Sequence, residues 1–332
     1  MLATPVIVQR GPKNGPRPIN PRRDIRQVLE LLDLAFGPIL DANGRRILDT
    51  RANIQYQAPY LMRLNLSNKS LAPGFVWEED GRVVGNVSLV QSDVPGRCLI
   101  ANVAVHPGYR RRGIGRMLLQ ECLEHIQSHH GRQVMLQVES NNDAAIQLYL
   151  DLGFSNIGTI RRWETTTSRL RNLPVGEDDY EVRPLGSRDW AAAYHLDRAC
   201  LDPNLNWPAP KDRDYFKNSF WRWVGNFLNG RKMETWIIAA PAEQENKQQL
   251  VGLATINSEW GRPHNLELRV LPSWRGQIER PLLAKLIRRL RYLRGTNILM
   301  DHITDDETVN SLLPEANFQI RRYLTFMHLY IN

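Results

Sequence analysis

The stretch Arg110-Arg111-Arg112-Gly113-Ile114-Gly115 decides the fold, because it joins a strand pattern to a helix pattern. Before it, Cys98–Val105 is an apolar, β-branched run that predicts a buried strand. After it, apolar side chains recur at helical spacing through residues 113–130. The two glycines therefore lie on a strand-to-helix turn, where main chain without Cβ atoms lets a ligand approach closely.

A turn of this kind predicts an anion site. The first N–H groups of a helix have no intrahelical partners, and the helix dipole adds positive potential at the same end. Together they suit a diphosphate, and the flanking arginines add charge. A Walker loop needs Gly-Lys-Ser/Thr, which is absent here, and a Rossmann fingerprint needs a third glycine where Leu118 stands. Taken alone, the turn leaves open that its glycines serve only tight packing.

Outward from the turn, strands and helices alternate in α/β fashion. Asp24–Phe36 has a helical apolar stripe, and Phe75–Glu78 and Val83–Val90 read as strands joined by an Asp80-Gly81 hairpin turn. We expect a short strand near Val6–Gln9 and an irregular loop after it. The further predicted elements are a strand at Val134–Val138, a helix at Asp143–Leu150 and an extended segment at Ile157–Thr167.

A second motif narrows the interpretation. Asn142-Asp-Ala-Ala145-Ile-Gln-Leu148-Tyr149 precedes Gly153-Phe154. With the first motif, it resembles the GNAT superfamily of acyl-CoA N-acyltransferases, whose patterns are Arg/Gln-x-x-Gly-x-Gly/Ala and Asn-x-x-Ala-x-x-Leu-Tyr followed by Gly-Phe. The close resemblance covers roughly residues 75–165, about a quarter of the chain.

The resemblance implies a mixed, strongly twisted sheet in which strands Cys98–Val105 and Val134–Val138 splay apart. The pantetheine arm of acetyl-CoA would lie in that wedge like an added strand, paired with the main chain of Val103 and Val105. Asn142 would contact or orient the pantetheine. The diphosphate would be bound by Arg110, Arg111, Arg112, Gly113, Ile114, Gly115 and Arg116. Acetyl-CoA is the expected co-substrate, and no metal is expected.

The chemistry implied is direct attack of an amine on the thioester. Tyr149 stands at the position of the family's general acid, and a phenol can protonate the departing thiolate. Gln137 and Asn102 stand where relatives place a carboxylate base, and neither amide can take up a proton. Glu139 is our choice for the base because it adjoins the wedge; Glu78, Glu79, Asp93 and water remain alternatives.

An internal repeat predicts two tandem domains of this α/β type. Val105-His-Pro-Gly-Tyr-Arg110 resembles Val270-Leu-Pro-Ser-Trp-Arg275, and Gly153-Phe154 resembles Asn317-Phe318 at nearly the same separation. We assign residues 1–170 to a catalytic domain and 180–332 to a degenerate copy, with a polar boundary at Ser168–Asp179. In the second copy Ile278 and Arg280 replace the glycines, Asp306 the asparagine and Leu313 the tyrosine. Glu267 occupies the position that matches Asn102.

Composition indicates the cellular compartment and whether a membrane-spanning helix is expected. The chain has 332 residues, a formal charge of +8 and three separated cysteines, which favours a cytoplasmic protein with reduced thiols. The sequence has no apolar run long enough to predict a transmembrane helix.

The leading hypothesis is an N-acetyltransferase that acts on a small-molecule or peptide amine, with no membrane partner. A non-catalytic acyl-CoA sensor is the alternative. Nucleic-acid binding through the basic helix Lys285–Arg294 is a minor third reading, and we do not expect it. Residues 38–74 carry no acceptor signature.

Overall fold

The computed structural model describes residues 14–37, 74–176, 180–207, 209–217, 230–240 and 249–331. It divides into two compact units. Unit 1 comprises residues up to Gln137 together with Leu148–Phe154 and His328–Asn332, and unit 2 comprises Val138–Gln147 and Ser155–Met327. The division by sequence into 1–170 and 180–332 stays a prediction.

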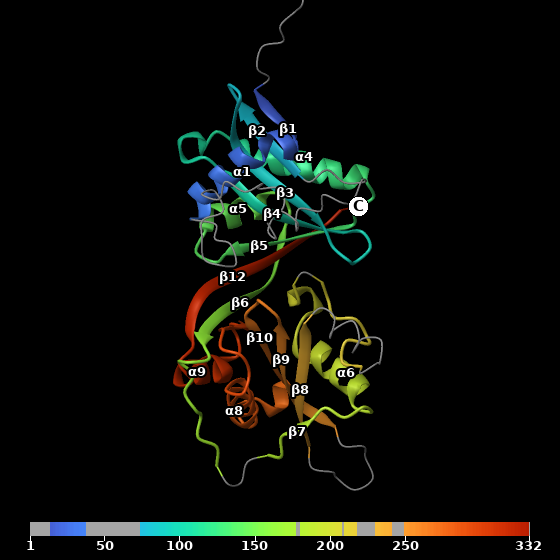
Figure 1. The fold of residues 1–332 in the computed structure, drawn as a ribbon. Helices are drawn as coiled ribbons and strands as arrows, with labels where there is room; N and C mark the ends of the chain where they lie inside the picture. The colour runs from blue at the N-terminus through green and yellow to red at the C-terminus, as the bar shows by residue number, and fades with distance from the viewer. Residues whose placement is uncertain are drawn as a thin grey trace, which may run out of the picture. The chain divides into compact units, whose positions relative to one another are not determined.

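Unit 1 is built on a mixed sheet in the order β1-β2-β3-β4-β5 (Figure 1). Neighbouring strands are antiparallel except β4 and β5, which are parallel. The strands are β1 (Gly15–Pro18), β2 (Gly74–Glu79), β3 (Arg82–Gln91), β4 (Arg97–Val105) and β5 (Gln133–Glu139), whose last two residues belong to unit 2. The end of the chain joins this unit, because the Ile331 N–H donates to the Arg132 carbonyl at 3.0 Å.

Helices cover both faces of this sheet. α1 (Pro21–Phe36) buries Val28 and Leu32 against Val76 of β2. α4 (Ile114–Ser128) lies on the opposite face, where the absent side chain of Gly85 leaves room for Leu118 and Ile114. A Cβ atom at Gly85 would lie 2.9 Å from Leu118 Cδ1, so this glycine is required by packing. α5 (Asp143–Asp151) follows β5.

Unit 2 repeats the plan in the order β6-β11-β10-β9-β8-β7. Within this order, β10 and β11 are parallel, as β4 and β5 are in unit 1, and the other neighbours are antiparallel. The strands are β6 (Ser155–Thr166), β7 (Arg183–Pro184), β8 (Arg231–Ala239), β9 (Leu250–Glu259), β10 (His264–Val270), β11 (Asn297–Ile303) and β12 (Gln319–Tyr330), whose last residues belong to unit 1. The helices are α6 (Trp190–Cys200), α8 (Glu279–Leu290) and α9 (Glu307–Glu315).

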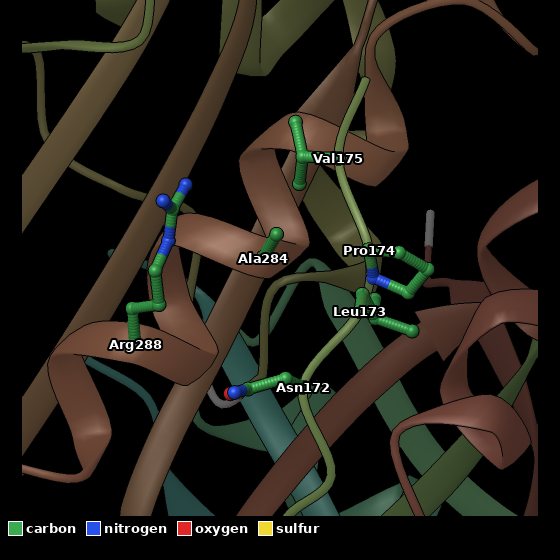
Figure 2. A pocket seen from close by; sticks show the side chains of 6 residues that line it. All are labelled: Asn172, Leu173, Pro174, Val175, Ala284 and Arg288. Carbon is green, nitrogen blue, oxygen red and sulfur yellow. The ribbon is translucent and has the colours of Figure 1, made fainter. Parts of the chain in front are cut away.

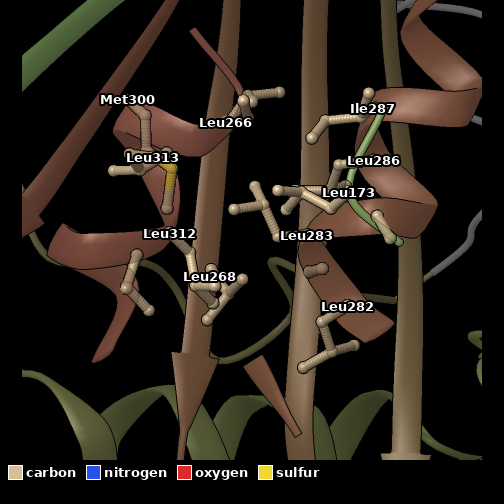
Figure 3. Packing of buried hydrophobic residues seen from close by; sticks show 14 of the residues in the cluster. Leu173, Leu266, Leu268, Leu282, Leu283, Leu286, Ile287, Met300, Leu312 and Leu313 are labelled. Atoms are coloured by element: carbon tan, nitrogen blue, oxygen red, sulfur yellow. The ribbon is translucent and has the colours of Figure 1, made fainter. Parts of the chain in front are cut away.

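The core of unit 2 lies between the sheet and the pair α8 and α9. Leu282, Leu283, Leu286 and Ile287 of α8 point toward Leu266 and Leu268 of β10 (Figure 3). Ile237 and Leu253 point to the other face, where α6 covers them. The apolar residues of the stretch Lys285–Arg294 are thus largely buried in this core, as its helical spacing predicts.

The predicted mixed α/β architecture is confirmed, and so are the elements expected from residue 24 to residue 167. Asp80 and Gly81 both have positive φ, 49° and 78°, as their hairpin turn requires. One expectation is wrong: Gly15–Pro18 is a strand and not part of an irregular loop. Its prolines are tolerated because β1 is the edge of the sheet. Residues 6–9 lie outside the described residues.

The duplication extends further than the sequence comparison found. In unit 1 the Arg17 guanidinium, on β1, binds the Asp24 carboxylate of α1 at 2.6 Å. In unit 2 the Arg183 guanidinium, on β7, binds Asp189, directly before α6, at 2.6 Å. Both arginines precede a proline, Pro18 and Pro184. The same ion pair therefore joins the first strand to the first helix in each copy.

Candidate active site

The turn after β4 has the geometry that the sequence predicts. A short 3₁₀ helix, Pro107–Tyr109, follows the strand, and Gly113 is the N-cap of α4 with a left-handed φ of 77°. The first hydrogen bond of the helix runs from the Met117 N–H to the Gly113 carbonyl at 3.0 Å. Among the described residues, the N–H groups of Gly113, Ile114, Gly115 and Arg116 have no acceptor. These four donors form a hydrogen-bonding edge at the positive end of the helix dipole.

The space beside Gly113 and Gly115 shows whether these glycines are needed for tight packing or leave room for a ligand. A Cβ atom at Gly113 would meet only Met117 Cε, at 3.7 Å. One at Gly115 would meet Leu148 Cδ2 at 3.5 Å and Val105 Cγ2 at 3.8 Å, which are ordinary contacts. Gly113 is required by its φ, but the fold itself does not require Gly115 to lack a side chain. The turn therefore fits a ligand that approaches the main chain closely.

The arginines of the turn have different partners. Arg112 forms an ion pair with Glu79 at 3.1 Å, and its guanidinium stacks over the Tyr109 ring at 4.8 Å. Arg116 binds Asp151 at 2.6 Å. Arg110 Nε donates to the Val105 carbonyl at 3.2 Å. Arg111 is exposed, has a positive φ of 62°, and its side chain has no partner among the described residues, so it is the most available cation for a phosphate.

β4 and β5 stop pairing well before either strand ends. Their parallel register runs from Arg97 and Gln133 to Ile100 and Leu136, whereas β4 continues to Val105. Val103 is half-buried on this unpaired part of β4. The main chain of β4 beyond Ile100 is thus not paired with β5, which is where an extended ligand could add as a strand.

Tyr149 lies on the last turns of α5 and is 5% exposed. Its ring packs edge-on against Phe154 with 5.8 Å between centroids. Burial raises the pKa of the Tyr149 phenol to about 12. Its hydroxyl makes no hydrogen bond with the described residues, and the group therefore remains a protonated donor without an acceptor in that part of the chain.

Asn142 directly precedes α5 and is exposed. Its side-chain oxygen accepts the Ala145 N–H at 3.2 Å, which caps the helix. Asp306 has the same role in unit 2, where its carboxylate accepts the Val309 N–H at 3.1 Å at the start of α9. The structure thus gives Asn142 a capping role that the sequence comparison did not consider, with its side-chain N–H₂ group still available.

The candidate carboxylates are mostly engaged. Glu139 forms an ion pair with Arg322 of β12 within unit 2. Glu78 binds Arg17 and Arg23, and Glu79 binds Arg112, whereas Asp93 is exposed. An ion-paired carboxylate must give up its partner before it can accept a proton from a substrate. Glu139 as the base stays a prediction.

The second copy fills the corresponding places with its own side chains. Ile278, which replaces Gly113, is buried, and Pro281, in the place of Arg116, has no N–H. The Glu279 carboxylate accepts the N–H groups of Gly276 at 2.9 Å and Ile278 at 3.1 Å. Burial raises the pKa of this carboxyl, and these hydrogen bonds oppose the effect.

Glu267 in the second copy is part of a closed network in unit 2. The Lys211 ammonium binds Glu267 at 2.6 Å and Asp197 at 2.7 Å, and Arg269 binds Asp197 at 3.1 Å. The lysine is 7% exposed and lies over the Tyr215 ring at 5.0 Å. The carboxylate that matches the family's base position therefore holds an internal ammonium.

Two surface cavities among the described residues lie in unit 2. One has a volume of about 400 Å³, and Figure 2 shows Asn172, Leu173 and Pro174 of the segment after β6 facing Ala284 and Arg288 of α8. The other, of about 640 Å³, is lined by Trp190, Asp212, Arg213, Asp214 and Lys217. Neither contains a residue of the predicted site. In the described part of the chain no helix is long and apolar enough to cross a membrane.

A family model described as acetyltransferase (GNAT) matches residues 43–154. The matched segment is a GNAT domain. It contains the turn at Gly113–Arg116 (the open turn), Tyr149, and the strands β4 and β5, which pair only as far as Ile100 and Leu136. The GNAT architecture extends over the whole chain: a structure titled as a tandem GNAT protein from the clavulanic acid biosynthesis pathway aligns over 96% of this chain and 98% of its own, with a TM-score of 0.52 and 17% identity. A GCN5-related N-acetyltransferase from Sphaerobacter thermophilus aligns over 95% of each chain with a TM-score of 0.59 and 15% identity. At such identities the likeness concerns the fold alone.

Curated relatives match parts of the GNAT domain. The N-alpha-acetyltransferase RimI of Mycobacterium tuberculosis is 38% identical over 105 residues, 31% of this chain and 60% of its own length. The [ribosomal protein bS18]-alanine N-acetyltransferase of Salmonella typhimurium is 46% identical over 61 residues, 18% of this chain and 40% of its own. The peptidyl-lysine N-acetyltransferase YiaC of Escherichia coli is 41% identical over 83 residues, 25% of this chain and 50% of its own. The chain thus spans about half the length of these relatives.

Proposed function

We propose that the protein transfers an acetyl group from acetyl-CoA to a primary amine of a small molecule or peptide. The observation that carries the proposal is the open turn at Gly113–Arg116, whose four N–H donors have no partner among the described residues and whose two glycines leave the main chain accessible. A diphosphate fits these donors, and Arg111 can contribute charge. The names of the relatives support a protein or peptide amine as the acceptor.

The catalytic roles follow from the chemistry of the transfer. The amine attacks the thioester carbonyl, and the Val103 or Val105 N–H stabilises the developing oxyanion. The C–S bond then breaks, and the Tyr149 hydroxyl protonates the thiolate. A phenol with a pKa of about 12 is protonated throughout the neutral range. Glu139 takes the proton from the attacking amine once its ion pair with Arg322 opens.

We further propose that residues 1–170 form the catalytic domain and that the copy in residues 180–332 does not bind acetyl-CoA. Ile278 is buried where the first copy has Gly113, and its N–H donates to the Glu279 carboxylate. Pro281, in the place of Arg116, has no N–H to offer. One acetyl-CoA per chain is expected in isothermal titration calorimetry.

The test is a transfer assay with purified protein, acetyl-CoA and a panel of amines. The panel contains peptides with a free α-amine, Nα-blocked lysine peptides and small polyamines. Thiol release measures turnover, and mass spectrometry identifies the acetylated nitrogen. Amine-dependent release supports the proposal. Binding of acetyl-CoA without transfer across the panel would instead support the acyl-CoA sensor, and absence of binding would exclude both.

A further inference from the structure

The pairing of β3 with β4 contains an irregularity that sequence patterns do not reveal. Ser88 lies opposite Ala101 and Asn86 opposite Ala104, so that Val87 alone faces both Asn102 and Val103. This is a β-bulge, which leaves an extra residue on β4 and bends the strand. Asn102 within it has a φ of 54°, a left-handed conformation that asparagine and glycine adopt most readily. The bulge begins two residues after the last pair of β4 with β5, Ile100 and Leu136.

Two buried polar side chains hold this bulge. The Asn86 side-chain N–H₂ donates to the Asn102 main-chain carbonyl at 2.8 Å and contacts Ser88 Oγ at 3.3 Å. The Asn102 side chain contacts the same hydroxyl at 3.3 Å. Asn86 and Ser88 are both fully buried, and Asn86 Oδ1 has no hydrogen-bond partner among the described residues. A buried amide with an unsatisfied oxygen is unfavourable for stability, so a role other than stability is the better explanation for it.

The second copy provides the internal comparison. There β9 and β10 pair in unbroken register, from Asn257 with Asn265 to Gly252 with Val270. Leu253, opposite Arg269 and directly after Gly252, stands in the place of Asn86, which directly follows Gly85. Two residues further along the strand, Thr255 stands in the place of Ser88. The amide of Asn86 is therefore present where the bulge is present and replaced by an apolar side chain where it is absent, whereas a hydroxyl is kept at the second position. The copy without the bulge is also the one whose turn is closed by Glu279.

From this geometry we infer that Asn86 is a positioning residue for acyl transfer: by holding the Asn102 carbonyl, it fixes the bulge in β4 and thereby the direction of the Val103 N–H. This inference rests on the proposed function, in which that N–H faces the thioester. Without the Asn86 donor, the bulge can relax toward the regular register that β10 shows. A shift of about 1 Å in a group that binds the reacting atoms can lower turnover about 100-fold.

The experiment compares Asn86→Leu, which copies the second domain, with a pair of variants at Asn102. Asn86→Leu should lower kcat about 10- to 100-fold. It should change the Kd of acetyl-CoA much less, because the turn at Gly113 is untouched. Asn102→Gly keeps the positive φ and should retain kcat within about threefold, whereas Asn102→Ala should lose more because alanine disfavours that conformation. Thr255→Val, which removes the buried Thr235–Thr255 hydrogen bond of 3.0 Å in unit 2, is the control for lost stability alone.

The outcomes separate the inference from the proposed function. An Asn86→Leu variant with wild-type kcat, or equal kcat for Asn102→Gly and Asn102→Ala, overturns the inference while the function stands. The same holds if Thr255→Val lowers kcat as much as Asn86→Leu does. If the wild-type protein transfers acetyl to no amine, the proposed function fails. The bulge can then still be tested by NMR, which follows the chemical shift of the ¹⁵N-labelled Val103 amide during titration with acetyl-CoA. This amide signal should shift alike in the wild-type protein and in Asn102→Gly. The same shift in Asn86→Leu would overturn the inference. The Asn102 pair also serves if Asn86→Leu fails to fold.

Discussion

The N-termini of α4 and α8 show two outcomes of the same local physics. Both helices follow a strand and a 3₁₀ turn, and both begin with main-chain donors that lack intrahelical partners. At α4 the donors are left open, and two glycines keep side chains away. At α8 the Glu279 carboxylate accepts two N–H groups next to the helix start, and Ile278 fills the space. At α8 the main-chain donors next to the helix start are thus satisfied by a side chain of the same copy.

The largest expected effect comes from closing the open turn. Gly115→Val adds a branched side chain beside the free donors, and acetyl-CoA should bind about 100-fold more weakly, a loss of about 2.7 kcal/mol. The fold should persist, because a Cβ atom at Gly115 meets no atom closer than 3.5 Å. Calorimetry measures Kd, and thermal unfolding checks the fold. Gly108→Ala, on the exposed 3₁₀ turn before the donors, is the matched control and should bind normally. Unchanged affinity in Gly115→Val would show that the diphosphate does not bind here.

The second prediction concerns Tyr149, whose counterpart in the second copy is Leu313. Tyr149→Phe removes only the hydroxyl, which has no acceptor among the described residues, so stability should change little. Turnover should fall about 100-fold, the low end for general acid catalysis, with acetyl-CoA affinity preserved.

The pH dependence sharpens the assignment of Tyr149. Since burial holds the Tyr149 pKa at about 12, the phenol should stay protonated from about pH 7 to about pH 10. Over this range the kcat of the wild type should therefore not fall through loss of the Tyr149 proton. The pH profiles of the wild type and of Tyr149→Phe should have the same shape there. Full turnover in Tyr149→Phe would remove the residue from the mechanism.

The third prediction tests the Glu279 carboxylate, which accepts two main-chain N–H groups in the second copy. Glu279→Ala leaves the buried N–H of Ile278 and the exposed N–H of Gly276 without their acceptor, so the free energy of unfolding should fall by about 1–3 kcal/mol at neutral pH, measured by urea denaturation. Acetyl-CoA affinity should not change, because the open turn belongs to the other copy. A variant as stable as the wild type would mean that the carboxylate contributes nothing at this helix.

The same carboxyl has a pH signature with a definite sign. Because burial raises its folded pKa above the ordinary value of 4.5, the folded protein binds the proton more tightly than the unfolded chain does. The contribution of Glu279 to stability is therefore greatest at and below pH 4.5 and declines as the pH rises through the raised pKa. Glu279→Gln should remove this part of the pH dependence. A profile identical to that of the wild type would contradict the assignment.

Periodicity and turn chemistry predicted the elements because these signals are local. The strand at Cys98–Val105, the helix after Gly113 and the Asp80-Gly81 hairpin turn each depend on neighbouring residues only. What the sequence did not reveal depends on register or distance. The bulge at Asn102 exists only in the pairing of two strands, and Glu139 meets Arg322, a residue 183 positions away. In the sequence, Glu279 is one acidic residue in a first helical turn among many such residues. That it accepts two N–H groups depends on the conformation of the preceding loop, which the sequence does not show.

The smallest expected effect lies at another position shared by the two copies, after α5 and α9. Gly153 and Asn317 both have positive φ, 88° and 66°, and each precedes a buried phenylalanine, Phe154 or Phe318. Gly153→Ala should destabilise the protein by about 1 kcal/mol, because an L-residue with a Cβ atom disfavours this conformation. Asn317→Gly relieves that strain but loses the hydrogen bond from Asn317 Nδ2 to the Arg169 carbonyl at 2.8 Å, so its net change should be smaller. Urea denaturation of both variants measures the difference. Equal losses would mean that backbone conformation is not what distinguishes the two sites, and that the space near Leu329, 3.5 Å from a Cβ atom at Gly153, decides instead.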